Sequence, residues 1–203
     1  MKILQIESDN PTSKAADKVV AIASSKGGLE ALQQILSSLP ADFNGAIVIV
    51  QHISALFKSH LASVLDRHAS LKIEQATEGA KLLLGKVYVA PPDHHVIVNR
   101  DGSLSLSHAP KEHFVRPSAE YTFKSLADSY REKAIAVVLT GYDGDGREGI
   151  RVVKEKGGKT IAQDRSTSLV FDMPESAIAT GCVDLILPLD KIADGIISMV
   201  NAR

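Results

Sequence analysis

Short apolar runs alternate with helix-like segments along most of this chain. The runs at 19–23 and 46–51 have the length of strands, and each precedes a segment with helical spacing of its apolar residues. Parallel neighbours need a crossover between them, so this alternation favours a parallel sheet covered by helices on both faces. We therefore predict an α/β fold with a doubly wound, mostly parallel sheet. The expected strands of this sheet are 19–23, 46–51, 86–90, 134–140, 159–162 and 183–188. The expected helices are 29–39, 59–68, 118–130, 147–156 and 189–201.

One part of the chain departs from this alternation. Residues 96–99 form a short apolar run that ends in Asn99, residues 104–107 alternate apolar and polar residues, and Arg100-Asp101-Gly102-Ser103 lies between the two segments. Asp-Gly between two such segments is a strong signal for a hairpin. We expect a small antiparallel β-hairpin at this point.

The length of the chain is sufficient for one large core. It has 203 residues, of which 44% are hydrophobic, and two full domains are not expected at this size. Residues 1–9 alternate like a strand, and residues 10–18 are polar and rich in helix breakers. We predict an N-terminal tail or linker over 1–18 and a single domain over 19–203.

Composition argues against several classes of protein. The formal net charge is −1, which leaves no basic excess for binding nucleic acid. Apolar runs such as 46–50 and 134–139 are far shorter than the roughly 20 residues of a membrane-spanning helix. Cys182 is the only cysteine, so no internal disulfide is possible and a reducing compartment fits. We expect a cytoplasmic protein that does not insert into membranes.

Three predicted strand ends carry side chains suited to catalysis. Ser25 follows the first strand, His52 follows the second, and the run 140–146 with Asp143 and Asp145 follows the apolar run at 134–139. In a doubly wound sheet, functional groups gather at the carboxyl ends of the strands. A serine hydroxyl needs a base to take its proton, and an imidazole does this best when a carboxylate orients it. Ser25, His52 and one of the two aspartates could fill these roles.

Each of these residues also has a simpler explanation. A serine after a strand commonly caps a helix, a glycine-rich turn often binds phosphate, and aspartate between glycines commonly forms a turn. A calcium loop beginning at Asp143 would place Arg147 and Lys154 at positions that require oxygen ligands. Calcium binding is therefore excluded for this loop, and we expect no metal site.

Six motifs occur together in this sequence. They are Ala21 to Gly28, Gln51-His52, Arg116-Pro117-Ser118, Leu139-Thr140-Gly141 with Asp145-Gly146, Thr160 to Gln163, and Val170 to Pro174. In their order and spacing they resemble the catalytic domain of the CheB family of chemotaxis receptor methylesterases, over about 19–200.

This resemblance implies hydrolysis of glutamate methyl esters on chemotaxis-type receptors by a Ser-His-Asp triad, and also glutamine deamidation. It implies receptors and other chemotaxis signalling proteins as partners and no cofactor. The family's nucleophile falls on Ser25, its base on His52 and its acid on Asp145. An arginine of the family pattern falls on Arg116, which could bind acidic substrate or anchor its loop.

An oxyanion hole would complete such a site. We expect it to be formed by backbone amides around Lys26 and Gly27 and near Tyr142, because free amides at the start of a helix bind negative charge.

The sequence departs from the family pattern beside the nucleophile. Ala23 stands where the family usually has glycine, and Lys26 where it usually has threonine. Two other functions therefore stay open, a catalytically impaired binding partner in signalling and a phosphate- or nucleotide-binding module. The family's usual N-terminal receiver domain has no counterpart in the 18 residues before the match, so we expect no phosphorylation switch in this chain.

Overall fold

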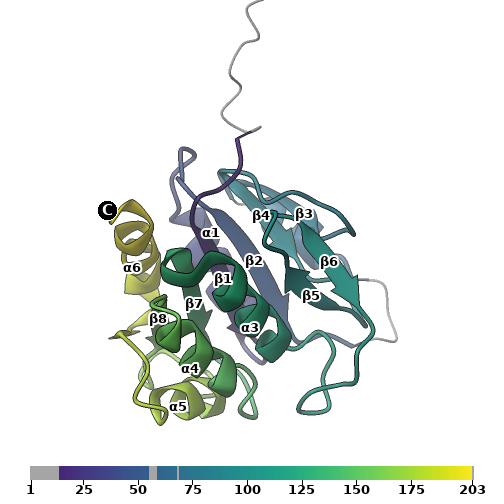
Figure 1. Ribbon diagram of the computed structural model, residues 1–203. Helices are drawn as coiled ribbons and strands as arrows, with labels where there is room; N and C mark the ends of the chain where they lie inside the picture. The colour runs from purple at the N-terminus through teal and green to yellow at the C-terminus, as the bar shows by residue number, and fades with distance from the viewer. Residues whose placement is uncertain (1–13, 55–58, 68, 203) are drawn as a thin grey trace, which may run out of the picture.

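A seven-stranded sheet forms the centre of the molecule (Figure 1). The structure is a computed structural model and describes residues 14–54, 59–67 and 69–202. The strand order is β3-β4-β2-β1-β7-β8-β9, and every neighbouring pair is parallel. The chain winds outward from β1 in both directions, so the predicted doubly wound sheet is confirmed. The strands of this sheet are β1 (Val19–Ser24), β2 (Ala46–Gln51), β3 (Lys72–Gln75), β4 (Lys86–Val89), β7 (Ala134–Val138), β8 (Lys159–Gln163) and β9 (Leu185–Leu187).

Helices cover both faces of the sheet, as predicted. The helices are α1 (Gly28–Ser37), α2 (Leu61–Asp66), α3 (Ala119–Tyr130), α4 (Arg147–Glu155), α5 (Asp172–Ile178) and α6 (Leu189–Asn201), with a short 3-10 turn, η2, at Arg131–Lys133. Figure 1 shows α3, α4 and α5 in front of the sheet.

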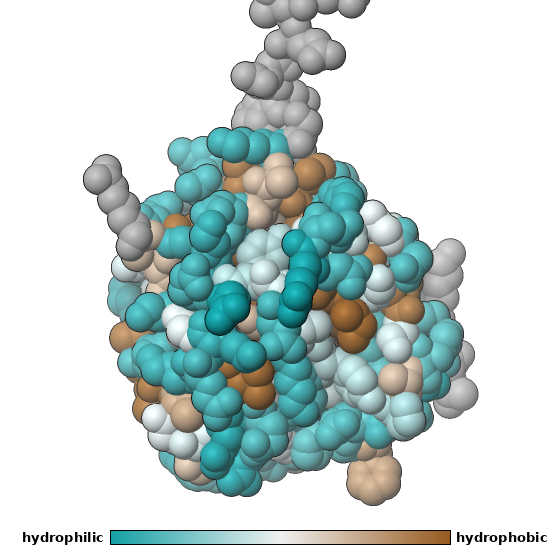
Figure 2. Space-filling model, viewed as in Figure 1, coloured by the Kyte–Doolittle hydropathy of each residue, from teal (hydrophilic) through white to brown (hydrophobic). Residues whose placement is uncertain are grey.

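Two separate apolar cores follow from the alternation of side chains along each strand. Ala21 of β1 packs with Phe123 of α3 and Ile150 of α4, whereas Ile22 packs with Leu32 of α1 and Ile196 of α6. Successive side chains of a strand point to opposite faces, so continuous apolar strands such as β1 fill both cores. The outer surface of the α3 and α4 side is largely hydrophilic (Figure 2).

The predicted hairpin is confirmed as a separate two-stranded sheet. β5 (His95–Val98) and β6 (Leu104–Ser107) pair antiparallel, with Val98 opposite Leu104. Val96 and Leu104 are buried in the core on the α3 side. The hairpin therefore packs on α3 instead of extending the main sheet.

One strand and one α-helix were not predicted from the sequence. β3 is an edge strand in which only Ile73 is buried, so it lacks an apolar run. α5 has Pro174 at its third residue, a position where proline is tolerated because the first amides of a helix have no partner within it. α2 and β9 are also shorter than predicted, at six and three residues.

The described part of the predicted tail, residues 14–18, contacts the rest of the chain. Ala15 pairs with Leu83 as an isolated bridge, and the Ala16 N–H donates to the Leu82 carbonyl at 2.9 Å. The rest of the tail, residues 1–13, lies outside the described residues. The boundary at residue 18 stays a prediction.

The strand order explains where functional side chains can meet. β1 lies between β2 and β7, and all three run in the same direction. The loops that follow them therefore leave the sheet at one edge and side by side. None of the helices described here is long and apolar enough to span a membrane.

Candidate active site

Ser25 occupies the turn between the central strand β1 and helix α1. Its N–H donates to the Thr140 carbonyl at 3.0 Å, and its carbonyl accepts from the Gly28 N–H at 3.0 Å. The Gln51 side chain also holds this turn, because its Nε2 donates to the Ser25 carbonyl at 2.8 Å and its Oε1 accepts from the Ser24 hydroxyl at 2.6 Å. The backbone of Ser25 is thus fixed from both neighbouring strand ends.

His52 follows β2 directly and is held next to this turn. Its backbone N–H donates to the Ser24 carbonyl at 3.0 Å. Its ring Nε2 lies 2.7 Å from Oδ2 of Asp145, and its side chain is only 9% exposed. With Nε2 engaged by a carboxylate, Nδ1 is the nitrogen left to accept a proton.

Asp145 lies in the loop before α4, and its side chain is fully buried against the N-terminus of α3. Oδ1 accepts from the Ser118 hydroxyl at 2.6 Å and from the Glu120 N–H at 3.3 Å, and Oδ2 accepts from the Ala119 N–H at 2.6 Å. Amides at a helix start have no partner within the helix and carry partial positive charge, so they favour a carboxylate here. Asp145 thus keeps its charge away from solvent.

These contacts determine the protonation of Asp145. Burial alone would raise its pKa, but the hydrogen bond and charge of His52 and the hydrogen bonds from Ser118 and Ala119 together hold the pKa below its usual value. Asp145 is therefore ionised near neutral pH. An ionised carboxylate can orient the imidazole and stabilise its cation.

Glu120 makes the reciprocal contact at the next helix. It lies in the first turn of α3, is 1% exposed, and accepts from the Glu148 N–H at 3.0 Å and the Gly149 N–H at 2.6 Å at the start of α4. Asp145, just before α4, binds the start of α3 in turn. The two helix starts are joined by two buried carboxylates, although burial raises the pKa of Glu120 above its usual value.

Ser25 and His52 line the same open pocket of about 430 Å³. No direct hydrogen bond joins the Ser25 hydroxyl to the His52 ring in the described structure, and such contacts in hydrolases often form fully only with substrate bound. The three candidate oxyanion amides belong to Lys26, Gly27 and Tyr142, all lining this pocket. Within the described residues, none of these three N–H groups donates to another backbone carbonyl.

Two glycines allow the loops to approach Ser25 closely. Gly27 has a φ of 80°, and a Cβ there would lie 2.9 Å from Cβ of Leu169. A Cβ on Gly141 would lie 2.6 Å from Cβ of Ser25 and 2.3 Å from Sδ of Met173. Glycine is therefore required at both positions for the turn to keep this shape.

Comparison with known proteins identifies the family. The model of the CheB methylesterase family matches residues 20–196. The chain belongs to the CheB methylesterase family. Its structure is similar to the crystal structure of the Thermotoga maritima CheB methylesterase catalytic domain, with a TM-score of 0.86, 39% identity, and coverage of 90% of this chain and 98% of that chain.

Curated relatives of this CheB-family chain carry a two-part name. A protein-glutamate methylesterase/protein-glutamine glutaminase of Bdellovibrio bacteriovorus is 38% identical over 194 residues, which is 94% of this chain and 54% of the relative. A putative protein of the same name from Leptospira interrogans is 38% identical over 177 residues, which is 87% of this chain and 92% of the relative. The chain thus spans about half the length of the first relative and nearly all of the second.

Arg116 of this CheB-family domain is engaged in holding its own loop. Nε and Nη2 donate to Oδ1 of Asp93 at 3.0 and 2.7 Å, and Nη1 donates to the carbonyls of His108 and Ala109, both at 3.0 Å. All three nitrogens of its guanidinium group are used in this way. These contacts favour the anchoring role over substrate binding.

The two departures from the family pattern have different structural settings. Ala23 is fully buried in the regular strand β1 opposite Val138, so its position does not require glycine. Lys26 is exposed on the pocket rim and forms no ion pair with any described residue. The strand β1 therefore accommodates Ala23, and the turn at Ser25 leaves the Lys26 side chain exposed.

Sequence reasoning missed the residues that support the proposed catalytic groups. Gln51 was noted only as a neighbour of His52, and the contacts of Ser118 and Glu120 with the two helix starts were not predicted. Pro117-Ser118 before a helical segment is a signal for a helix start, but which carboxylate binds there depends on the tertiary fold. His95, buried and within 3.2 Å of the Ser118 N–H, also supports this helix start.

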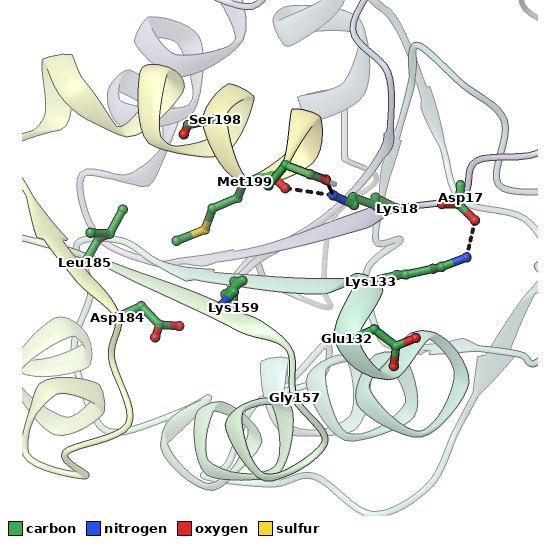
Figure 3. Close-up of a pocket in the computed structure, with 11 residues that line it drawn as sticks. Asp17, Lys18, Glu132, Lys133, Gly157, Lys159, Asp184, Leu185, Ser198 and Met199 are labelled. Carbon is green, nitrogen blue, oxygen red and sulfur yellow. Dashed lines mark hydrogen bonds and ion pairs between the residues drawn. The ribbon is translucent and has the colours of Figure 1, made fainter.

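A larger pocket of about 670 Å³ lies at the opposite end of the sheet, near the amino ends of β1, β7 and β8 (Figure 3). Among its charged residues, Lys133 pairs with Asp17 and Asp184 pairs with Lys154, whereas Lys18 Nζ donates to the Met199 carbonyl at 3.1 Å. None of the candidate site residues lines it. Over the described ranges, no cluster of three or more His, Cys, Asp or Glu residues could hold a metal ion.

Proposed function

We propose that this chain is a protein-glutamate methylesterase that acts on methylated chemotaxis-type receptors through Ser25, His52 and Asp145. The observation that carries the proposal is the 2.7 Å contact between His52 Nε2 and a fully buried Asp145, beside a pocket that also contains Ser25. The names of the curated relatives support the same activity.

The first half of the reaction forms an acyl-enzyme. The Ser25 Oγ attacks the ester carbonyl carbon, and its proton passes to Nδ1 of His52 while Asp145 stabilises the imidazolium. The amides of Lys26, Gly27 and Tyr142 bind the oxyanion of the tetrahedral intermediate. The C–O bond to the methoxy group breaks, and His52 returns its proton so that methanol leaves.

The second half releases the product. Water gives a proton to His52 and attacks the acyl carbon, and the second tetrahedral intermediate expels Ser25, which takes the proton back. The product is a glutamate side chain. The same steps on a glutamine side chain would release ammonia, which is the glutaminase reaction in the relatives' names.

Methanol release from a methylated receptor tests this proposal. We expect the wild-type chain to release methanol and Ser25→Ala to lose at least about a thousandfold in kcat, since the nucleophile is absent. Ser38→Ala is the matched control, because Ser38 is exposed at the far end of α1. Its rate should equal that of the wild type.

The same assay distinguishes an active esterase from a catalytically impaired binding partner in signalling. A folded wild-type chain that binds receptor without releasing methanol would contradict the esterase and favour that alternative. A Ser25→Ala variant as fast as the wild type would contradict the role of Ser25.

A further inference from the structure

Exposed apolar side chains gather around the pocket that contains Ser25 and His52. Six large apolar side chains are exposed among the described residues, and three of them line this pocket: Leu29 at 37%, Tyr142 at 57% and Leu169 at 68%. Phe114 is 96% exposed and lines an adjoining pocket of about 330 Å³. Exposed apolar clusters of this kind mark interaction surfaces.

The adjoining pocket continues the catalytic one, because His52 lines both. Its opposite wall is formed by residues 111 and 114–117. The two remaining exposed apolar residues, Leu185 and Ile186, belong to β9 at the edge of the sheet.

The backbone at the tip of this wall is held in an unfavourable conformation. His113 and Phe114 have φ values of 49° and 62°, in the left-handed region that residues other than glycine rarely adopt. The Val115 N–H donates to the Glu112 carbonyl at 2.9 Å and closes the turn. Such strain persists only where surrounding structure enforces it, and it is concentrated at functional sites.

The base of the same loop is firmly attached. Arg116 bonds to Asp93 and to two carbonyls of the loop, and the Pro110 carbonyl accepts from Nε2 of His95 and from the hydroxyl of Tyr121, both at 3.2 Å. The loop is therefore a fixed support for an aromatic ring that is not buried in the chain itself.

Resting on the proposed function, we propose that Phe114 is a docking residue for the protein substrate. The occupant is the polypeptide that carries the glutamyl ester. With the ester between Ser25 and His52, the next segment of the substrate enters the adjoining pocket. It places an apolar side chain on the aromatic ring of Phe114. Lys111 lines this pocket and has no ion pair with any described residue, so a carboxylate on the same segment complements its charge. Leu29, Tyr142 and Leu169 contact the substrate on the other side of the ester.

Binding in a variant that cannot turn over tests this surface. The measurement is the dissociation constant of Ser25→Ala for methylated receptor, with and without Phe114→Ala. We expect Phe114→Ala to weaken binding about tenfold, as for an aromatic anchor at an interface, and Phe114→Leu to restore most of the affinity. In the active chain, the loss should fall mainly on KM.

Ile186→Ala is the matched control, because Ile186 is 51% exposed and lies in β9. It should bind as the parent does. Unchanged affinity in Phe114→Ala, or equal losses in Phe114→Ala and Ile186→Ala, would overturn the proposal. Since binding is read in the Ser25→Ala background, absence of methanol release by the wild type would contradict the proposed function without deciding this question. Thermal unfolding of each variant confirms that it is folded.

Discussion

At the scale of single residues, Asp145 and Asp143 differ most clearly in their surroundings. The two lie in one loop, and sequence spacing alone left either as the partner of His52. Asp145 is fully buried against the ring, whereas Asp143 is exposed and accepts from the Asp145 N–H at 3.1 Å. Which of the two aspartates is buried depends on the contact between α3 and this loop. No local sequence pattern specifies that contact.

Asp145→Asn should reduce kcat for methanol release by about a thousandfold or more. The amide of asparagine cannot stabilise the imidazolium and can present a donor to Nε2, which favours the wrong tautomer. Asp143→Asn is the control, since it keeps an oxygen for the Asp145 N–H and should retain the wild-type rate. Comparable losses in both variants would contradict the assignment of the acid.

The placement of Ser25 and His52 at one edge of the sheet could be predicted because each directly follows an apolar strand. Gln51 could not be assigned from the sequence, because its partners, Ser24 and Ser25, belong to another strand end. Arg116 could be found by resemblance, but only its four hydrogen bonds distinguish an anchor from a binding residue.

At the scale of elements, the starts of α3 and α4 determine where Asp145 lies. The first amides of α3 donate to the buried carboxylate of Asp145, which lies just before α4. The first amides of α4 donate to the buried carboxylate of Glu120, which lies in the first turn of α3. Moving one helix start would therefore move Asp145, the proposed acid.

Glu120→Gln should lower kcat about tenfold and reduce the melting temperature by a few degrees. Glutamine can accept from only one of the two α4 amides and turns a donor toward the other, which leaves a buried N–H unpaired. Glu148→Gln is the control, because that side chain lies in the first turn of α4 but is 58% exposed. Methanol release and thermal unfolding of both variants check this, and an unchanged kcat in Glu120→Gln would contradict it.

The elements that the sequence predicted best are those with a continuous apolar run or a long amphipathic face. α6 was predicted with its observed bounds, and β1, β2 and β7 were found within two residues at each end. β3 was missed because an edge strand needs only one buried residue, here Ile73. α5 was missed because Pro174 in its first turn resembles a helix breaker.

At the scale of the whole molecule, buried carboxylates link stability to pH. The pKa of Asp145 is held below its usual value in the folded chain, so its ionised form adds stability above an ordinary aspartate pKa of about 3.9. This contribution is lost as pH falls from that value through the folded pKa. Glu120, whose pKa is raised by burial, contributes in the opposite direction.

The free energy of unfolding of the wild type should therefore decline as the pH falls below about 4. The free energy of unfolding of Asp145→Asn should decline less steeply over the same range. At pH 7 the variant should be less stable by about 2 kcal/mol, because charged hydrogen bonds at the start of α3 are lost. Urea unfolding at pH 7, 4 and 3 measures both effects. Parallel declines for the two proteins would contradict the lowered pKa.

The central claim is that Ser25 and His52 act as one catalytic unit. The rates of methanol release from methylated receptor by Ser25→Ala, His52→Gln and the double variant test it most directly. Groups that act together in one step are strongly non-additive, so the double variant should be about as slow as the slower single variant. Losses that multiply in the double variant, or a Ser25→Ala variant with the wild-type rate, would contradict the claim.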